Sequence, residues 1–98
     1  MNIGVIGSGT MGNGIAHVFS LYNNNVILVD ISKSILNNAI KTIENNMKRQ
    51  CSKDVINLNQ MELALANINT SINIEELKEC DLIIEAVKEN YNTKSEIF

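Results

Sequence analysis

A cluster of glycines near the amino terminus is the part of the sequence best suited to holding a ligand. All five glycines of the 98-residue chain lie between positions 4 and 14, within the stretch GVIGSGTMGNGIAHVF that covers residues 4–19. Glycine weakens helices and strands, so it is usually confined to loops and to places where another group approaches the backbone closely. Here the cluster joins an apolar run directly to a segment with helical periodicity, and we expect such a close approach.

The spacing of these glycines fits the pattern G-x-G-x-x-G. The residues of the pattern are Gly7, Ser8, Gly9, Thr10, Met11 and Gly12. An apolar run precedes them, a helical pattern follows, and the acidic Asp30 ends the next apolar run 18 residues after Gly12. This arrangement predicts a dinucleotide-binding site. A tight turn with a purely structural purpose is the alternative.

Each glycine of the pattern has a separate physical role in such a site. Gly7 permits a tight turn, Gly9 lets a pyrophosphate reach the backbone, and Gly12 lets the following helix pack closely. Gly14 is expected to extend that close packing. The pyrophosphate would meet free N–H groups at the positive end of the helix dipole.

Asp30 is the residue expected to choose between cofactors. Its carboxylate would accept hydrogen bonds from the adenosine ribose hydroxyls and would repel the 2′-phosphate of NADP. No arginine follows to offset that repulsion, so NAD is the favoured cofactor, and Lys33 is the nearby cation that could weaken the preference. A solvent-exposed acid that ends a strand and binds nothing is the alternative.

Strand-like and helix-like segments alternate along the chain and would position these residues. Short apolar runs predict strands at 2–7, 26–30, 68–72 and 81–87, with an asparagine turn at 23–25. Helical periodicity predicts helices at 10–22, from Ser32 as N-cap toward Gln50, at 53–66, at 73–80 and from 90 onward. The expected apolar helix faces are Met11, Ile15, Val18, Phe19 and Tyr22; then Ile35, Leu36, Ala39, Ile40, Ile43 and Met47; then Val55, Ile56, Leu58, Met61 and Leu65.

The alternation predicts an α/β fold built on a Rossmann-type parallel sheet with helices on both faces. We expect about four strands, with a helical pair inserted between the second and third. The first strand is expected at the centre, with the second and third strands on one side and the fourth on the other.

Composition excludes several other classes of protein. The chain is 45% hydrophobic with a net charge of −3, and its lysines alternate with acids, which argues against a nucleic-acid partner. No run approaches the roughly 18 apolar residues of a membrane helix, and a strand from residue 2 leaves no room for a targeting peptide. Cys51 and Cys80 lack metal-ligand spacing, so we expect no metal, no disulfide and a cytoplasmic location.

Three segments together resemble the N-terminal NAD-binding domain of the 3-hydroxyacyl-CoA dehydrogenases. They are GVIGSGTMGNGIAHVF, VILVDIS and DLIIEAVKENYNTKSEIF, and the resemblance covers essentially all 98 residues in order. It implies the NAD-linked interconversion of (3S)-3-hydroxyacyl-CoA and 3-ketoacyl-CoA, in fatty-acid or butanoate metabolism. It also implies that residues 7–12 and Asp30 bind the cofactor.

The resemblance assigns further residues to the two ligands. Ala86, Glu89 and Lys94 match family positions that line the cofactor cleft. Lys53, with Arg49 nearby, falls about where the family holds the CoA end of the substrate. A solvated helix end is the alternative for these two cations, as a solvated pair is for Glu89 and Lys94.

By the same resemblance, catalysis lies outside this chain. The family uses a histidine oriented by a glutamate, assisted by a serine and an asparagine, all in the stretch that follows Phe98. The one histidine present, His17, falls in the first expected helix, about two turns beyond the glycine loop. We therefore expect no catalytic residue within the chain, which alone would be inactive.

The end of the sequence leads to an expectation about the whole protein. The chain stops at Phe98 inside a periodic apolar pattern, and the strand at 81–87 would be a bare apolar edge. We expect residues 1–98 to be the NAD-binding front part of a longer protein. Its C-terminal helical domain would close the substrate cleft and form a homodimer.

Two other functions stay open at this point. The chain could be the nucleotide domain of a 6-phosphogluconate, 3-hydroxyisobutyrate or UDP-sugar dehydrogenase, although the long helical insertion at 32–66 favours the acyl-CoA enzymes. It could also be a stand-alone NAD-binding module without catalysis. A histidine within an HFFNP-like stretch after Phe98 would favour the acyl-CoA enzymes.

Overall fold

The structure, a computed structural model, describes residues 1–86. The strands are β1 (Asn2–Ile6), β2 (Asn25–Val29), β3 (Ile68–Ser71) and β4 (Leu82–Glu85). The helices are α1 (Thr10–Leu21), α2 (Lys33–Ser52), α3 (Leu58–Ala66) and η1 (Ile74–Glu79), the last a 3₁₀ helix. The predicted alternation is confirmed, including the helical pair between the second and third strands. The helix predicted from residue 90 lies outside the described residues.

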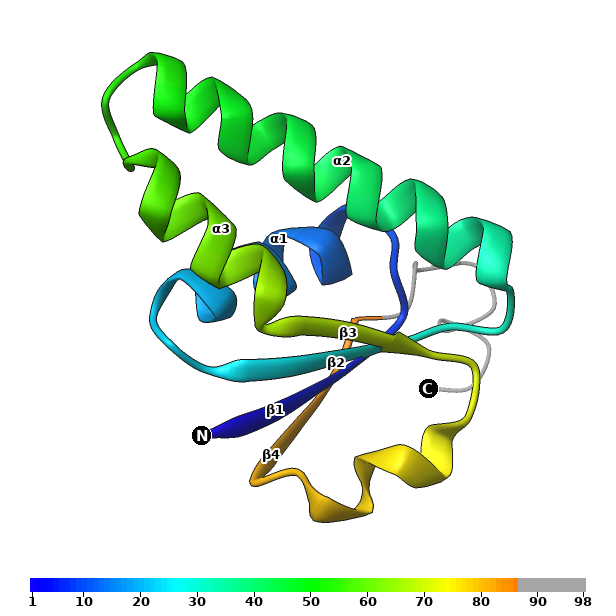
Figure 1. The fold of residues 1–98 in the computed structure, drawn as a ribbon. Helices are drawn as coiled ribbons and strands as arrows, with labels where there is room; N and C mark the ends of the chain where they lie inside the picture. Colours follow the sequence, from blue (N-terminus) through cyan, green and yellow to red (C-terminus); the bar gives the residue numbers. More distant parts are fainter. Residues whose placement is uncertain (87–98) are drawn as a thin grey trace, which may run out of the picture.

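The four strands form one parallel sheet in the order β3-β2-β1-β4 (Figure 1). β1 is therefore central, as predicted, and its Ile3 is paired with Val26 of β2 and with Leu82 of β4. The chain runs outward through β2 and β3 and then returns to place β4 on the other side of β1. In open α/β sheets, ligands bind beyond the carboxyl ends of the strands where the order reverses in this way.

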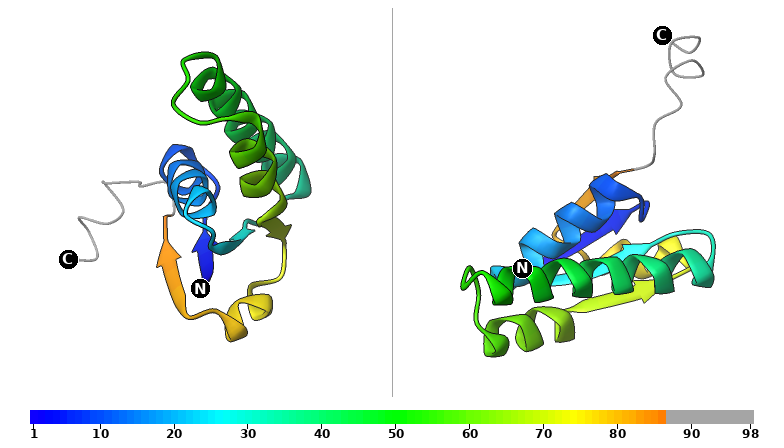
Figure 2. Two further views of the ribbon diagram at one scale, coloured as in Figure 1. Left: turned by 60° about the vertical axis from the view of Figure 1, so that its left-hand side comes forward. Right: turned by 90° about the horizontal axis from the view of Figure 1, so that it is seen from above.

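Helices lie on both faces of the sheet, as predicted. The three α-helices cover one face, and η1 lies on the other (Figures 1 and 2). On the η1 side, Gly4 of β1 faces Leu77: a Cβ added to Gly4 would lie 2.7 Å from Leu77 Cδ2. On the α-helical side, the core is apolar and closed; its largest fully buried members are Ile3, Val5, Val26, Leu28, Ile43 and Met47.

Helix α1 packs on the sheet through small residues, and the predicted apolar face is wrong in this respect. Its buried residues are Gly12, Ala16 and Ser20. Three of the expected apolar residues are instead exposed, namely Met11 (62%), Val18 (52%) and Tyr22 (75%). The other two expected residues, Ile15 and Phe19, are partly buried and pack against the core, as predicted. Small side chains let the helix approach the strands closely, and the three exposed residues lie off this contact.

The boundary between α2 and α3 also differs from the prediction. The helix predicted over residues 53–66 begins only at Leu58, because the chain turns at Asp54 (φ 60°) and leaves Val55 exposed. Asn57 then caps α3: its side chain accepts a hydrogen bond from the Gln60 N–H, and the Gln60 side chain accepts one from the Asn57 N–H. This is a capping box, which fixes where a helix starts.

Three smaller differences concern element ends. The asparagine turn is shorter than expected, because Asn25 already belongs to β2 while Asn23 takes a positive φ of 63°. Ser32 is the N-cap residue of α2, as predicted, but its hydroxyl contacts Ser34 Oγ rather than a backbone N–H. In the predicted fourth strand, Leu82 is 43% exposed, since β4 has only β1 as a partner within residues 1–86.

Candidate functional site

The loop after β1 makes the tight turn that the glycine pattern predicts. Gly7 has a φ of 98°, a conformation that residues with a side chain rarely adopt. Its N–H donates a hydrogen bond of 2.8 Å to the carbonyl oxygen of Val29, at the end of β2. The loop is thereby fastened to the neighbouring strand at the carboxyl edge of the sheet.

Gly12 marks the close approach that the sequence suggested. A Cβ placed on Gly12 would lie 1.8 Å from the carbonyl oxygen of Gly7 and 3.6 Å from Ala86 Cβ. No side chain can occupy this position, because the first turn of α1 rests directly against the loop backbone. Gly14 does not extend the contact as expected: a Cβ there would meet nothing within 4 Å.

The start of α1 is open to an anion. Its N-cap residue is Gly9, which has no side chain to accept from the first N–H groups, and its first turn contains no acid. The first N–H groups of a helix have no partner within the helix, and the helix dipole makes this end positive. The backbone at Gly9 is bare, so a phosphate group can approach these donors.

Asp30 lies at the end of β2, beside this loop. Its Oδ2 accepts hydrogen bonds from the Ser8 N–H (2.8 Å) and from the Ser8 hydroxyl (2.7 Å). Its Oδ1 accepts one from the N–H of Ile31 (2.7 Å). The sequence predicted that Asp30 and the glycine loop belong to one site, and the structure brings them into contact. The two bonds from Ser8 were not anticipated, since no local pattern links residues 22 positions apart.

These contacts keep Asp30 ionised. Partial burial acts to raise the pKa of its carboxyl group, but the hydrogen bonds from the Ser8 hydroxyl and from the Ile31 and Ser8 N–H groups outweigh that effect. The net result is a pKa below the ordinary aspartate value. A fixed negative charge thus stands at the carboxyl edge of β2, where it can accept hydrogen bonds from sugar hydroxyls and oppose a phosphate.

Ala86 closes the other side of the loop. It follows β4 and is buried, and its N–H donates a 2.7 Å hydrogen bond to the carbonyl oxygen of Ile6. Three chain segments therefore meet at the carboxyl edge of the sheet, after β1, β2 and β4. Glu89 and Lys94, predicted to line the same cleft, lie outside the described residues.

Lys33, the cation that could have weakened a preference for NAD, does not pair with Asp30 in the described part of the chain. It is the first residue of α2 and lines a small cavity of about 120 Å³ together with Thr70 and Ser71 of β3. The charge of Asp30 is therefore not neutralised by a protein cation in residues 1–86.

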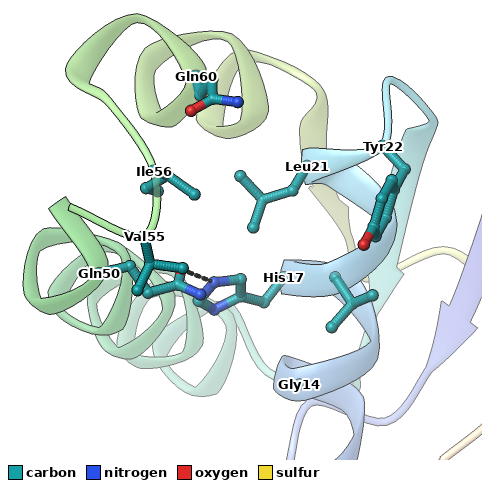
Figure 3. Close-up of a pocket in the computed structure, with 9 residues that line it drawn as sticks. Gly14, His17, Leu21, Tyr22, Gln50, Val55, Ile56 and Gln60 are labelled. Atoms are coloured by element: carbon teal, nitrogen blue, oxygen red, sulfur yellow. Dashed lines mark hydrogen bonds between the residues drawn. The ribbon is translucent and has the colours of Figure 1, made fainter. Parts of the chain in front are cut away.

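His17 lies away from the glycine loop, in a separate pocket between α1 and the turn that joins α2 to α3 (Figure 3). The pocket has a volume of about 480 Å³. Its lining residues include Gly14 and Leu21 of α1, the C-cap residue Tyr22, and Ile56 of the turn. His17 points toward α2, and its Nε2 lies 2.6 Å from Gln50 Oε1. No local pattern predicts this pocket, because it forms between segments far apart in the chain.

Arg49 and Lys53, the cations assigned to the CoA end of a substrate, lie at the far end of α2. Arg49 is in the last turn and Lys53 is the C-cap residue, and both are exposed. α2 has 20 residues and is therefore about 30 Å long, so the two cations lie far from the end of α2 that follows Asp30. They flank Gln50, which lines the His17 pocket.

The described residues carry neither a metal-ligand cluster nor a helix able to span a membrane. Among residues 1–86, no group of three or more histidine, cysteine or acidic side chains is placed to hold a metal ion. None of the helices in that range combines the length and the apolar character needed to cross a membrane. A bare helix start, a glycine that touches the loop and an ionised aspartate together fit a dinucleotide rather than a metal.

Comparison with known proteins agrees with this chemistry. Residues 2–98 match the family described as "3-hydroxyacyl-CoA dehydrogenase, NAD binding domain". A "3-hydroxybutyryl-CoA dehydrogenase" of Bradyrhizobium diazoefficiens is 42% identical over 96 residues, which cover 98% of this chain and 33% of that protein. A "peroxisomal fatty acid beta-oxidation multifunctional protein" of Arabidopsis thaliana is 36% identical, with 98% of this chain and 13% of that protein covered.

Solved structures show the same relationship. The crystal structure of (S)-3-hydroxybutyryl-CoA dehydrogenase from Ralstonia eutropha is 36% identical, with a TM-score of 0.88 over 98% of this chain and 34% of that one. The 3-hydroxybutyryl-CoA dehydrogenase of Escherichia coli also has a TM-score of 0.88, at 34% identity, over 100% of this chain and 21% of that one. The chain thus spans about a third or less of the relatives compared. By the match over residues 2–98, it belongs to the family of the 3-hydroxyacyl-CoA dehydrogenase NAD-binding domain.

Proposed function

We propose that this chain is the NAD-binding portion of an oxidoreductase that interconverts (3S)-3-hydroxyacyl-CoA and 3-ketoacyl-CoA. The close packing of Gly12 on the loop carries the proposal. A Cβ added to Gly12 would lie 1.8 Å from the Gly7 carbonyl oxygen, so the helix starts directly on the loop. Its bare first turn then lies beside the ionised Asp30. A ligand with a pyrophosphate and a free ribose diol uses both features. The family description supports NAD as that ligand.

Each part of the site has a defined task in this proposal. The Gly7–Gly12 loop and the first turn of α1 bind the pyrophosphate through backbone N–H groups. Asp30 accepts a hydrogen bond from the adenosine ribose and opposes a 2′-phosphate. Ala86 is assigned to the cleft toward the nicotinamide, and the family resemblance assigns Glu89 and Lys94, which lie outside the described residues, to binding of the same cofactor. When bound, NAD supplies the ring that takes the hydride from the substrate.

The acyl-CoA end of the substrate is assigned to the other end of the α-helical layer. Arg49 and Lys53 are exposed cations on α2, and no acid pairs with them within residues 1–86. They can therefore meet the phosphates of CoA. The length of α2 supports the idea that an elongated substrate reaches from the cofactor cleft to these cations.

Catalysis and assembly belong to the whole protein in this proposal. His17 is hydrogen-bonded to Gln50 in a separate pocket, so we assign it no catalytic role, and the chain alone binds NAD without turning over substrate. The general base and the dimer contacts are assigned to the part of the protein that the relatives have in addition. The two free cysteines suit a reducing compartment such as the cytoplasm.

A titration with reduced cofactors tests the proposal. NADH is added to the chain and its own fluorescence is followed, with NADPH in parallel; the chain contains no tryptophan. We expect saturable binding of NADH, weaker binding of NADPH, and loss of this preference in Asp30→Ala. Glu62→Ala removes an exposed charge from α3 and is the matched control.

Each outcome of the titration bears on a separate part of the proposal. If the wild-type chain bound neither cofactor, these residues would not form the proposed site. If both cofactors bound equally well, the role of Asp30 would be wrong.

A further inference from the structure

We propose that Ser8 sets the choice between NAD and NADP by holding the Asp30 carboxylate in place. The inference rests on the proposed function, in which Asp30 faces the adenosine ribose. Ser8 is the variable residue between the first two glycines of the pattern, a position where the loop itself requires no hydroxyl. The Ser8 hydroxyl donates a hydrogen bond to the Asp30 carboxylate, so we assign Ser8 a positioning role.

The hydrogen bonds of Asp30 show how firmly the carboxylate is held. An ionised carboxylate offers about four acceptor positions, two on each oxygen. The Ser8 N–H and hydroxyl occupy both positions on Oδ2, at 2.8 and 2.7 Å, and the Ile31 N–H occupies one on Oδ1, at 2.7 Å. No group of residues 1–86 donates to the second position on Oδ1, which we assign to a ribose hydroxyl.

The hydroxyl of Ser8 is the one side-chain donor in this set. The two N–H groups are part of the backbone and are present whatever the side chains are, whereas the hydroxyl depends on serine at position 8. Ser8 is only 5% exposed, so bulk water has little access to replace the hydroxyl. Hydrogen bonds to a charged acceptor are among the stronger ones in proteins.

A fixed carboxylate affects the two cofactors differently. A ribose hydroxyl donates to the open position on Oδ1, while the 2′-phosphate of NADP has no proton to donate and carries like charge. With the Ser8 hydroxyl removed, one of the two bonds on Oδ2 is lost and the carboxylate can turn toward solvent. The hydrogen bond from the NADH ribose to Asp30 is then weakened, and the repulsion between Asp30 and the 2′-phosphate of NADPH is reduced.

The test is the ratio of the NADPH and NADH dissociation constants for the chain. In Ser8→Ala we expect this ratio to fall about 3- to 10-fold, the range for one hydrogen bond. Ser20→Ala is the matched control: Ser20 is as buried as Ser8, but its hydroxyl donates to the His17 carbonyl within α1. A general loosening of the fold would weaken both cofactors equally and leave the ratio unchanged.

A double-mutant cycle shows whether Ser8 acts through Asp30. In an Asp30→Ala background, Ser8→Ala should leave the ratio as it is, because the carboxylate is gone. A cofactor-free readout accompanies it: the ¹³C shift of the Asp30 carboxyl should titrate at higher pH in Ser8→Ala than in wild type.

The two proposals fail in different ways. Suppose that wild type prefers NADH and that Ser8→Ala changes neither the ratio of the two dissociation constants nor the pH at which Asp30 titrates. The inference about Ser8 is then wrong, and the proposed function stands. If wild type binds neither cofactor, the proposed function fails, and the role of Ser8 fails with it.

Discussion

Alanine substitutions at Gly12 and Gly14 should have opposite effects on stability, although both glycines lie in α1 two residues apart. A Cβ at Gly12 would lie 1.8 Å from the Gly7 carbonyl oxygen, a backbone atom that cannot move aside by changing rotamer. A Cβ at Gly14 would meet nothing within 4 Å. Gly12→Ala therefore forces the helix and the loop apart, whereas Gly14→Ala changes only helix propensity.

The magnitudes follow from these two situations. Overpacking against backbone costs about 3 kcal/mol at the upper end of its usual range. Replacing an unconstrained helical glycine by alanine gains about 1 kcal/mol. The gain in helix propensity applies to both variants, because both glycines lie in α1, so it cancels in the comparison. The free energies of unfolding of the two variants should thus differ by about 3 kcal/mol. At roughly 4–8 °C per kcal/mol for a domain of this size, their melting temperatures should differ by about 12–24 °C.

Circular dichroism during heating and during urea unfolding measures this difference directly. The stability of the wild-type chain should lie between those of the two variants. The same samples should show cofactor binding in Gly14→Ala and none in Gly12→Ala, since the displaced loop carries the pyrophosphate donors. Equal melting temperatures for the two variants would show that α1 does not rest on the loop at Gly12.

Two further predictions concern charge. The pKa of Asp30 is lowered in the folded chain, so its contacts stabilise the fold above the ordinary carboxyl pKa of 3.8, and this contribution is lost as the pH falls through the lowered value. The free energy of unfolding should therefore be higher for wild type than for Asp30→Asn at pH 6, and the difference should shrink below pH 3.8. A difference that stays constant across this pH range would show that the Asp30 carboxylate does not stabilise the fold. Replacing Arg49 and Lys53 together by glutamine should weaken coenzyme A binding, measured by calorimetry, and reduce its salt dependence; unchanged affinity would remove both residues from the substrate site.

The sheet was predictable from sequence because its signals are local and strong. Short apolar runs such as VILVD need burial on both sides, and their alternation with helical segments leaves few arrangements of parallel strands. Asp30 was linked to the glycine loop by the same reasoning, since residues that follow neighbouring parallel strands meet at one edge. This rule predicts which segments lie close together but not which atoms form hydrogen bonds. The contacts between Ser8 and Asp30 could therefore be identified only in the structure.

Helix faces were harder to predict, because hydrophobicity is a poor guide when a helix packs very closely. α1 buries the small residues Gly12, Ala16 and Ser20, which a pattern of large apolar residues does not identify, and it exposes Tyr22. The start of α3 had a signal that periodicity concealed. Asn57 with glutamine three residues later is the spacing of a capping box, but the apolar residues before it continued the helical pattern. Gly12 and Gly14 could not be distinguished until the loop that touches one of them was placed.

Binding of a pyrophosphate at the start of α1 can be followed residue by residue through amide chemical shifts during an NAD titration. In ¹H–¹⁵N spectra of the chain, we expect saturable shifts at residues 7–12, at Asp30 and Ile31, and at Ala86. The amides around His17 and Gln50 should change little. Shifts confined to the pocket between α1 and the turn after α2, with the glycine loop unaffected, would show that the cofactor does not bind at the start of α1.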